Sequence, residues 1–294
     1  MRTTEYLDDE DEYIPWKTAL NALHYIDLML SRTASYGLFQ AYMRKQVELL
    51  YRTYGWHVDA DDTDQMLTLL RMEATHTACT YGSKDCLTEA TNKFNEWQQS
   101  INAGTPYPVS VNYRLTVYCQ GIKTGDVDEW DFVWDVYQSE DWPAERERLL
   151  EGLSCNTAPW ILTRYLERSM GDDEVPQSEA YLVLLHTANN HLGRYLAWDF
   201  LRANYDAASK RFGARLSDVV AAITGAFNTQ FELGEVHSFR ASLPTDDSSM
   251  NHMWDTAEET IVGNIQYMTN NEEELVNWLN SNAEARHRAS VMSS

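Results

Sequence analysis

The sequence predicts an all-α protein in which pairs of antiparallel helices stack into a superhelical array, and three observations lead to this fold class. Apolar residues recur with the three-to-four-residue spacing of helices along most of the chain. No segment shows the alternation typical of a strand, and only 13 Gly and 7 Pro interrupt the pattern. Roughly fourteen helices joined by short connections in one chain favour a solenoid over a compact bundle.

The first elements are two amphipathic helices. Pro15 is expected to open the first of them, because proline is favoured in the first helical turn. Gly55 is placed to end the second, since glycine commonly follows a helix C-terminus. The apolar stripes that define these two helices are Trp16, Ala19, Leu20, Leu23, Ile26 and Leu30, and then Phe39, Tyr42, Met43, Leu50 and Tyr54.

Further stripes continue to the C-terminal end of the sequence. They are Met66, Leu69, Leu70 and Ala74; Leu192, Tyr195, Leu196, Phe200 and Ala203; Leu216, Val219, Val220, Ile223 and Phe227; Ile261, Ile265 and Met268; and Leu275, Trp278 and Leu279. Asn270 and Asn271 precede three glutamates, which predicts a helix cap followed by an acidic first turn. The segments 105–110 and 242–249 are proline-containing and predict loops.

The composition indicates a globular protein with a strongly acidic surface. Hydrophobic residues make up 44% of the 294 residues, and the net charge is -22. The electrostatic field of this negative charge repels phosphate backbones and anionic lipid, so we expect no nucleic-acid partner and no membrane-surface binding. No apolar run is long enough for a membrane-spanning helix, and the acidic residues 1–12 do not match a secretory signal, so we expect no direct membrane insertion.

The usual catalytic signatures do not occur in the sequence. There is no G-x-S-x-G, Walker loop, G-x-G-x-x-G, C-x-x-C or H-E-x-x-H. His186 and His191, the closest histidine pair, are five residues apart and would lie about 140° apart around a helix, which suits one metal ion poorly. Acidic clusters such as 172–174 and 272–274 occur where acids complement helix N-termini. We therefore expect no catalytic residue and no metal ligand in this chain.

The four cysteines, Cys79, Cys86, Cys119 and Cys155, are the most informative polar residues. No histidine lies at a zinc-finger spacing from them, so a metal site is disfavoured. One short and one longer interval suggest the pairs Cys79–Cys86 and Cys119–Cys155, although spacing alone allows three pairings. Four reduced thiols in a cytosolic helical protein remain the alternative.

Several segments resemble, in order, the C-terminal helical domain of the aminopeptidase N-like zinc aminopeptidases. The similar segments are YIPWKTALNALHYIDLML (13–30), ACTYGSKDCLTEATNKFNEW (78–97), VYCQGIKTGDVDEWDFVWDVY (117–137), LSCNTAPWILTRYLERSM (153–170) and NNHLGRYLAWDFLRANY (189–205). The agreement in order and spacing extends from about Tyr13 to Trp278. Several elements matching in order are more specific than any one of them.

This resemblance implies a right-handed, HEAT-like and bowl-shaped α-solenoid that contains the two disulfides Cys79–Cys86 and Cys119–Cys155. It implies a parent zinc aminopeptidase in which this domain caps the active site, limits peptide access and moves during domain closure. The zinc and the H-E-x-x-H and G-A-M-E-N motifs belong to the catalytic domain, and neither motif occurs here. We therefore expect no cofactor and no catalysis in this chain alone, and an extracellular or secretory-pathway setting.

The resemblance also suggests which residues face the peptide cavity. Some family members hold the peptide C-terminus with basic residues, but the matching loops here carry the neutral Asn156 and Asn189, which fits broad specificity better. Asn189, Asn190 and Arg194 lie at the start of a predicted helix, where backbone N–H groups and a guanidinium can hold a carboxylate. Ordinary capping by Asn190 and an acid partner for Arg194 are the alternative.

Arg164 lies beside Trp160 and Tyr165 and either points into the cavity or braces helices, and bracing is favoured. Trp198 and Asp199 are expected to pack and to cap, and the segment 212–217 either approaches the catalytic domain or is a plain connection.

The expected organisation is a single helical domain over 13–287, with an acidic lead-in at 1–12 that resembles a truncated start of the domain, and a flexible tail at 288–294. Its expected partners are the parent's catalytic domain and peptide substrates, with homodimers in some family members. The rival hypothesis is a free-standing helical scaffold, receptor or dimerisation domain that has lost the enzyme.

Overall fold

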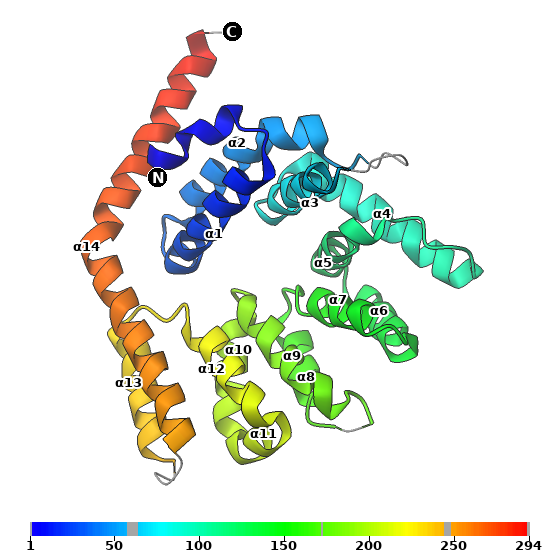
Figure 1. Ribbon diagram of the computed structural model, residues 1–294, viewed down its shortest axis with the longest axis vertical. Helices are drawn as coiled ribbons and strands as arrows, with labels where there is room; N and C mark the ends of the chain where they lie inside the picture. The colour runs from blue at the N-terminus through cyan, green and yellow to red at the C-terminus, as the bar shows by residue number, and fades with distance from the viewer. Residues whose placement is uncertain (1, 58–63, 172, 244–247, 293–294) are drawn as a thin grey trace. The chain divides into compact units, whose positions relative to one another are not determined.

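The computed structural model describes residues 2–57, 64–171, 173–243 and 248–292, and these residues form helices and the loops between them, with no strand among them (Figure 1). The predicted all-α class is therefore confirmed. The chain forms two compact units. Unit 1 comprises residues 1–116 and 267–294, and unit 2 comprises residues 117–266.

Unit 1 contains the short helix η1 (Arg2–Asp9), four α-helices and the end of α14. The α-helices are α1 (Tyr13–Leu30), α2 (Tyr36–Tyr54), α3 (Gln65–Thr80) and α4 (Lys84–Ala103), followed by η2 (Val111–Tyr113). Their apolar faces meet in one core that includes Trp16, Phe39, Met43 and Leu70. The side chains of Met268, Leu275 and Leu279 from α14 complete it.

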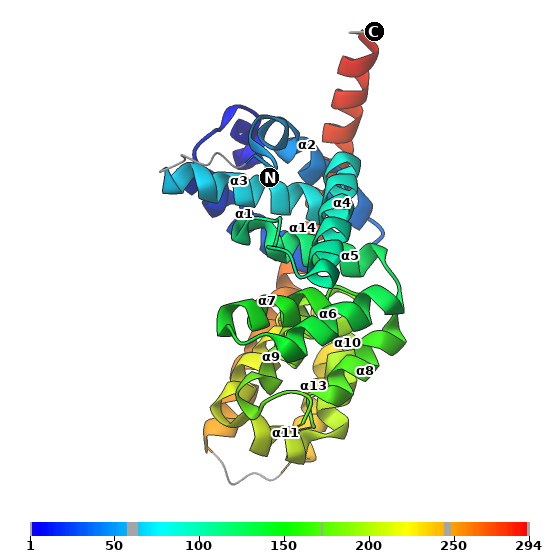
Figure 2. The ribbon, with the colours of Figure 1, turned by 90° about the vertical axis from the view of Figure 1, so that its right-hand side faces the viewer.

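Unit 2 contains α5 (Arg114–Thr124), which starts in unit 1, and eight further helices before α14. These are α6 (Val127–Ser139), α7 (Pro143–Leu153), α8 (Pro159–Arg168), α9 (Gln177–Asn189), α10 (Gly193–Ala203), α11 (Tyr205–Phe212), α12 (Leu216–Thr224) and α13 (Gln230–Ala241), with η3 (Gly213–Arg215) between α11 and α12. Helix α9 is central, because it contacts α7, α8, α10 and α12 (Figure 2). Large aromatic side chains such as Trp130, Tyr165 and Trp198 fill the core.

Local sequence signals explain many helix ends. Asp126 and Glu129 form a capping box at α6, and Thr229 and Glu232 form another at α13. Pro143 and Pro159 occupy the first positions of α7 and α8, where a missing N–H costs no helical hydrogen bond. Gly55 ends α2 as predicted.

Two predicted helix starts are wrong. Helix α1 begins at Tyr13, so Pro15 lies within the first turn, where its missing N–H is equally harmless. Asn270 and Asn271 do not cap a new helix, because α14 (Ser248–Met292) is continuous.

The reason is visible along α14 itself. Buried Trp254, Ile261, Met268 and Leu275 recur every seven residues without a break, so the buried stripe stays in register through the asparagine pair. Asn271 donates its side-chain N–H to the carbonyl of Tyr267 within the same helix, at 2.8 Å.

The segments expected to flank the domain are partly structured. Residues 2–9 form η1, in which Leu7 is buried and Thr4 hydrogen-bonds Tyr42 of α2 at 2.6 Å. Residues 288–292 of the expected tail belong to α14, and 293–294 lie outside the described residues. The segment 105–110 is a loop as predicted, whereas 244–247 of the second expected loop also lie outside the described residues.

Candidate functional site

Four of the five candidate peptide-facing residues meet where two loops of unit 2 lie against each other. We call this the loop node and define it as residues 154–158, between α7 and α8, together with 189–194, at the start of α10. The node contains Asn156, Asn189, Asn190 and Arg194. The fifth candidate, Arg164, lies on α8.

Asn190 joins the two loops of the node. Its side-chain Nδ2 donates to the carbonyl oxygens of Ser154 at 2.7 Å and Asn156 at 2.9 Å. Its Oδ1 accepts from the backbone N–H groups of Leu192 at 2.8 Å and Gly193 at 3.3 Å. The side chain therefore caps the start of α10, as the capping alternative predicted, and it also crosslinks the loops.

Asn156 is 3% exposed, and it too serves the backbone. Its Oδ1 accepts from Ala158 N at 2.7 Å, and its Nδ2 donates to the carbonyl of Ile122 in α5 at 3.4 Å. A disulfide adjoins this contact, because Cys155 is bonded to Cys119 of α5. Two neighbouring residues thus fasten the α7–α8 loop to α5, Cys155 by a covalent bond and Asn156 by one hydrogen bond.

Arg194 is 1% exposed, and its Nε donates to the carbonyl of Ala188 at 3.1 Å. Its guanidinium therefore stabilises the end of α9. Gly193 is required beside it, because a Cβ at this position would lie 2.5 Å from the carbonyl oxygen of Thr187. Asn189 differs from its neighbours, since its side chain is exposed to solvent.

Arg164 braces two helices, as favoured from the sequence. Its Nη2 lies 2.7 Å from Asp131 Oδ1 on α6, and its guanidinium lies 4.6 Å from the ring centre of Trp130 and 5.4 Å from that of Trp160. With 29% of its side chain exposed, it still presents an edge to solvent.

Trp198 packs as expected, whereas Asp199 lies within α10 and pairs with Arg202 of the same helix, so its expected capping role is wrong.

His186 on α9 is the most perturbed histidine near the node. Burial lowers the pKa of its imidazole to about 4, and its Nε2 has no hydrogen-bond partner among the described residues. It is therefore neutral at physiological pH and acts as a packing residue. In the described part of the chain, no three His, Cys, Asp or Glu side chains gather closely enough to hold a metal ion.

Both disulfides implied by the family resemblance are present. Cys79 is bonded to Cys86, and Cys119 is bonded to Cys155, so the hypothesis of four free thiols is wrong. The first closes the turn between α3 and α4, where Gly82 has a φ of +84° that favours glycine.

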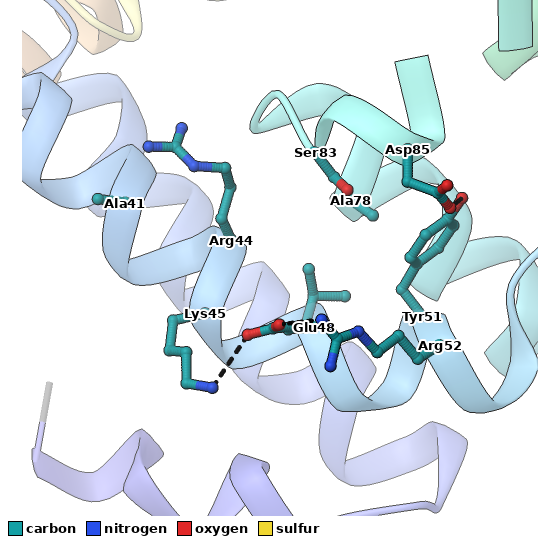
Figure 3. A pocket seen from close by; sticks show the side chains of 10 residues that line it. Ala41, Arg44, Lys45, Glu48, Tyr51, Arg52, Ala78, Ser83 and Asp85 are labelled. Carbon is teal, nitrogen blue, oxygen red and sulfur yellow. Dashed lines mark hydrogen bonds and ion pairs between the residues drawn. The ribbon is translucent and has the colours of Figure 1, made fainter. Parts of the chain in front are cut away.

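Sequence reasoning did not find a groove in unit 1 beside this turn. It has a volume of about 580 Å³ and lies between α2 and the start of α4 (Figure 3). Its lining residues are Ala41, Arg44, Lys45, Val47, Glu48, Tyr51, Arg52, Ala78, Ser83 and Asp85. We call it the α2 groove. A helical projection of 41–52 shows that its charged residues share one side of α2, but only the fold brings Ser83 and Asp85 opposite them.

No described helix is both long enough and apolar enough to cross a bilayer.

Comparisons with known proteins agree on one family. The family model described as ERAP1-like C-terminal domain matches residues 1–262. The chain is 32% identical over 292 residues to aminopeptidase N of Canis lupus familiaris, which covers 97% of this chain and 30% of that protein. It is 32% identical over 285 residues to aminopeptidase Ey of Gallus gallus, covering 95% of this chain and 29% of that protein.

A third relative is the thyrotropin-releasing hormone-degrading ectoenzyme of Rattus norvegicus, 31% identical over 287 residues, covering 95% of this chain and 26% of that protein. The chain thus spans less than a third of the length of these relatives.

Proposed function

The chain belongs to the family of ERAP1-like C-terminal domains, and we propose that it is the non-catalytic helical part of a zinc aminopeptidase. The observation that carries the proposal is that 97% of the chain aligns with only 30% of an aminopeptidase N. The absence of H-E-x-x-H from the sequence supports it, because that motif supplies two zinc ligands and a general base.

We propose that zinc is held by the parent's catalytic domain, and that this chain caps the active site and controls peptide access and domain closure. The metal would activate water for hydrolysis there. The described residues of this chain offer no set of side chains that fits zinc, so no chemical step is assigned to them. The bowl-shaped, right-handed superhelix expected for the family stays a prediction.

Within this role, the loop node acts as a rigid support. The side chains of Asn156, Asn190 and Arg194 form hydrogen bonds with backbone groups. We therefore assign these three residues to positioning the loops of the node. Asn189 and the exposed edge of Arg164 are then the groups offered to a peptide. The neutral amide of Asn189 gives no charge-assisted bond to a peptide carboxylate, and the guanidinium of Arg164 is already paired with Asp131. Both observations support broad specificity over tight C-terminal anchoring.

An extracellular or secretory-pathway setting is part of the proposal. Two disulfides persist in oxidising compartments, and one relative is named an ectoenzyme. The partners we propose are the catalytic domain and peptide substrates.

Reconstitution tests the proposed function. The portion of the parent that precedes this domain is produced separately and assayed with and without this chain, on alanine p-nitroanilide and on alanine peptides of three to ten residues. We expect added chain to change the dependence of kcat/KM on peptide length more than it changes anilide hydrolysis, because the anilide makes few contacts beyond the catalytic centre. An identical length profile with and without the chain would argue against the capping role.

A further inference from the structure

The α2 groove is held open by a hydrogen bond at each end. At one end, Arg44 Nη1 of α2 donates to the carbonyl of Tyr81 in the α3–α4 turn, at 2.7 Å. At the other, the Tyr51 hydroxyl donates to Asp85 Oδ2 of α4, at 3.1 Å. Arg44 and Tyr51 are seven residues apart, which places them on the same face of α2 two turns apart. The walls of the groove are therefore fixed relative to each other.

The turn that forms the far wall is itself rigid. The disulfide Cys79–Cys86 closes it, and the N–H of Ser83 donates to the carbonyl of Ala78 at 2.9 Å. A wall built in this way keeps its shape before any ligand arrives, so little ordering cost opposes binding.

One carboxylate in the middle of the groove pairs with two cations. Figure 3 shows Glu48 between Lys45 and Arg52, and its carboxylate lies 3.0 Å from Lys45 Nζ and 2.7 Å from Arg52 Nη2. The hydrogen bond from Lys45 lowers the pKa of Glu48, although partial burial opposes this, so the carboxylate is ionised at neutral pH. Lys45, Glu48 and Arg52 together therefore keep one net positive charge, and each of them has an ion-pair partner.

The two ends of the groove carry charges that are not cancelled. Arg44 donates only to a neutral carbonyl, and Asp85 accepts only from the Tyr51 hydroxyl, so neither has an ion-pair partner within the described residues. Burial and the bond to Asp85 raise the pKa of Tyr51, so its hydroxyl stays protonated and does not replace a cation. The groove thus has a free positive end and a free negative end.

We propose that the α2 groove binds a short peptide with free termini, with its carboxylate at Arg44 and its ammonium group at Asp85. The two turns between residues 44 and 51 span about 10 Å, which matches an extended peptide of about three residues. The volume of about 580 Å³ is ample for such a ligand. Binding here does not depend on the proposed place of the chain in an aminopeptidase.

The lining also has apolar members. Ala41, Val47 and Ala78 are apolar and offer no side-chain hydrogen bond. Trialanine is therefore a suitable probe, because its side chains are small and apolar and its only charges are the two termini.

Calorimetric titration of the chain with trialanine at low salt tests this proposal, together with N-acetyl-trialanine and trialanine amide. We expect free trialanine to bind about tenfold or more tightly than either capped peptide, because each cap removes one charge-assisted interaction. Arg44→Gln and Asp85→Asn remove single charges while keeping a polar side chain, and each should weaken trialanine binding by a similar factor. Arg215→Gln, which removes an arginine from η3 in unit 2, is the matched control and should bind normally.

The orientation gives a sharper criterion. With Arg44→Gln, amidation of the peptide C-terminus should have no further effect, whereas with Asp85→Asn the same should hold for N-acetylation. Equal binding of free and capped trialanine, or unchanged binding to both variants, would overturn the proposal. Circular dichroism of each variant verifies the fold, so a lost signal is attributable to the removed charge.

Discussion

The two disulfide-linked loop regions use the same covalent bond for different purposes. In unit 1, Cys79–Cys86 closes a turn between consecutive helices, and the sequence separation is 7. In unit 2, Cys119–Cys155 fastens the loop node to α5 across a separation of 36.

The polar side chains around these two bonds differ as well. In the loop node, the side-chain amide groups of Asn156 and Asn190 form hydrogen bonds with backbone atoms. Beside the α3–α4 turn, Arg44 and Asp85 each make one neutral hydrogen bond and keep their charge uncompensated. The difference supports the positioning role that we propose for the node and the binding role that we propose for the groove.

Removal of the long-range disulfide is expected to have the largest effect on stability. In the chain-entropy model, a loop of about 37 residues contributes about 4 kcal/mol to the free energy of unfolding, and a loop of about 8 residues about 2.5 kcal/mol. The pair Cys119→Ala and Cys155→Ala should therefore destabilise the chain more than the pair Cys79→Ala and Cys86→Ala. Urea unfolding of both double variants measures the difference in the free energy of unfolding. A larger loss for the Cys79–Cys86 pair would contradict the larger stabilisation that we assign to the disulfide at the node.

The second prediction is that the free energy of unfolding depends on pH because of His186. Burial lowers the pKa of this imidazole to about 4 in the folded chain, against about 6.5 in the unfolded chain. Its contribution to stability is fully retained above pH 6.5 and is lost as the pH falls toward 4, because only the unfolded state then takes up the proton.

The loss is on the order of 3 kcal/mol across that window. His186→Gln cannot take up this proton, so the difference in unfolding free energy between the two proteins should change between pH 7 and pH 4. A constant difference over that range would show that His186 is accessible to solvent rather than packed beside the node.

Asn190→Ala should cost about 2 to 3 kcal/mol, because it removes a helix cap and leaves the carbonyls of Ser154 and Asn156 without a donor. Asn190→Asp keeps the acceptor that caps α10 but loses both donated bonds, so it separates the two contributions. Thermal unfolding measures both variants. A cost below about 0.5 kcal/mol for the alanine variant would mean that the crosslink between the loops is not needed.

The smallest expected change in stability comes from substitutions at two glycines, Gly193 and Gly234. Gly193→Ala places a Cβ 2.5 Å from the Thr187 carbonyl oxygen, and we expect a loss of about 1 to 3 kcal/mol from overpacking. Gly234→Ala on α13 meets nothing within 4 Å and should stabilise the chain by up to about 1 kcal/mol. If both variants changed stability equally, the close packing of the node would be in doubt.

Periodicity and glycine placement were sufficient to predict the helical class and elements such as α2, since a burial stripe and a stop signal are local properties. They failed at Asn270 and Asn271, because two good capping residues cannot end a helix whose buried stripe continues in register through them. Spacing alone left the disulfide pairing open, and the family resemblance supplied it.

The structure brings four of the candidate residues together in the node, but their burial was not foreseeable. Whether the side chain of Arg194 is exposed to solvent depends on how α9 and α10 pack. The amino-acid sequence alone does not give this packing. The α2 groove was missed for a related reason: Arg44 and Asp85 are 41 residues apart in sequence and meet only through the α3–α4 turn.

We propose that this chain supports an enzyme and does not catalyse peptide hydrolysis on its own. The most direct measurement is to incubate the purified 294-residue chain with zinc, remove the excess, and determine both bound zinc and the hydrolysis of alanine p-nitroanilide. We predict substoichiometric zinc and no turnover above the protein-free rate. One zinc ion per chain together with saturable turnover that a chelator abolishes would contradict the claim.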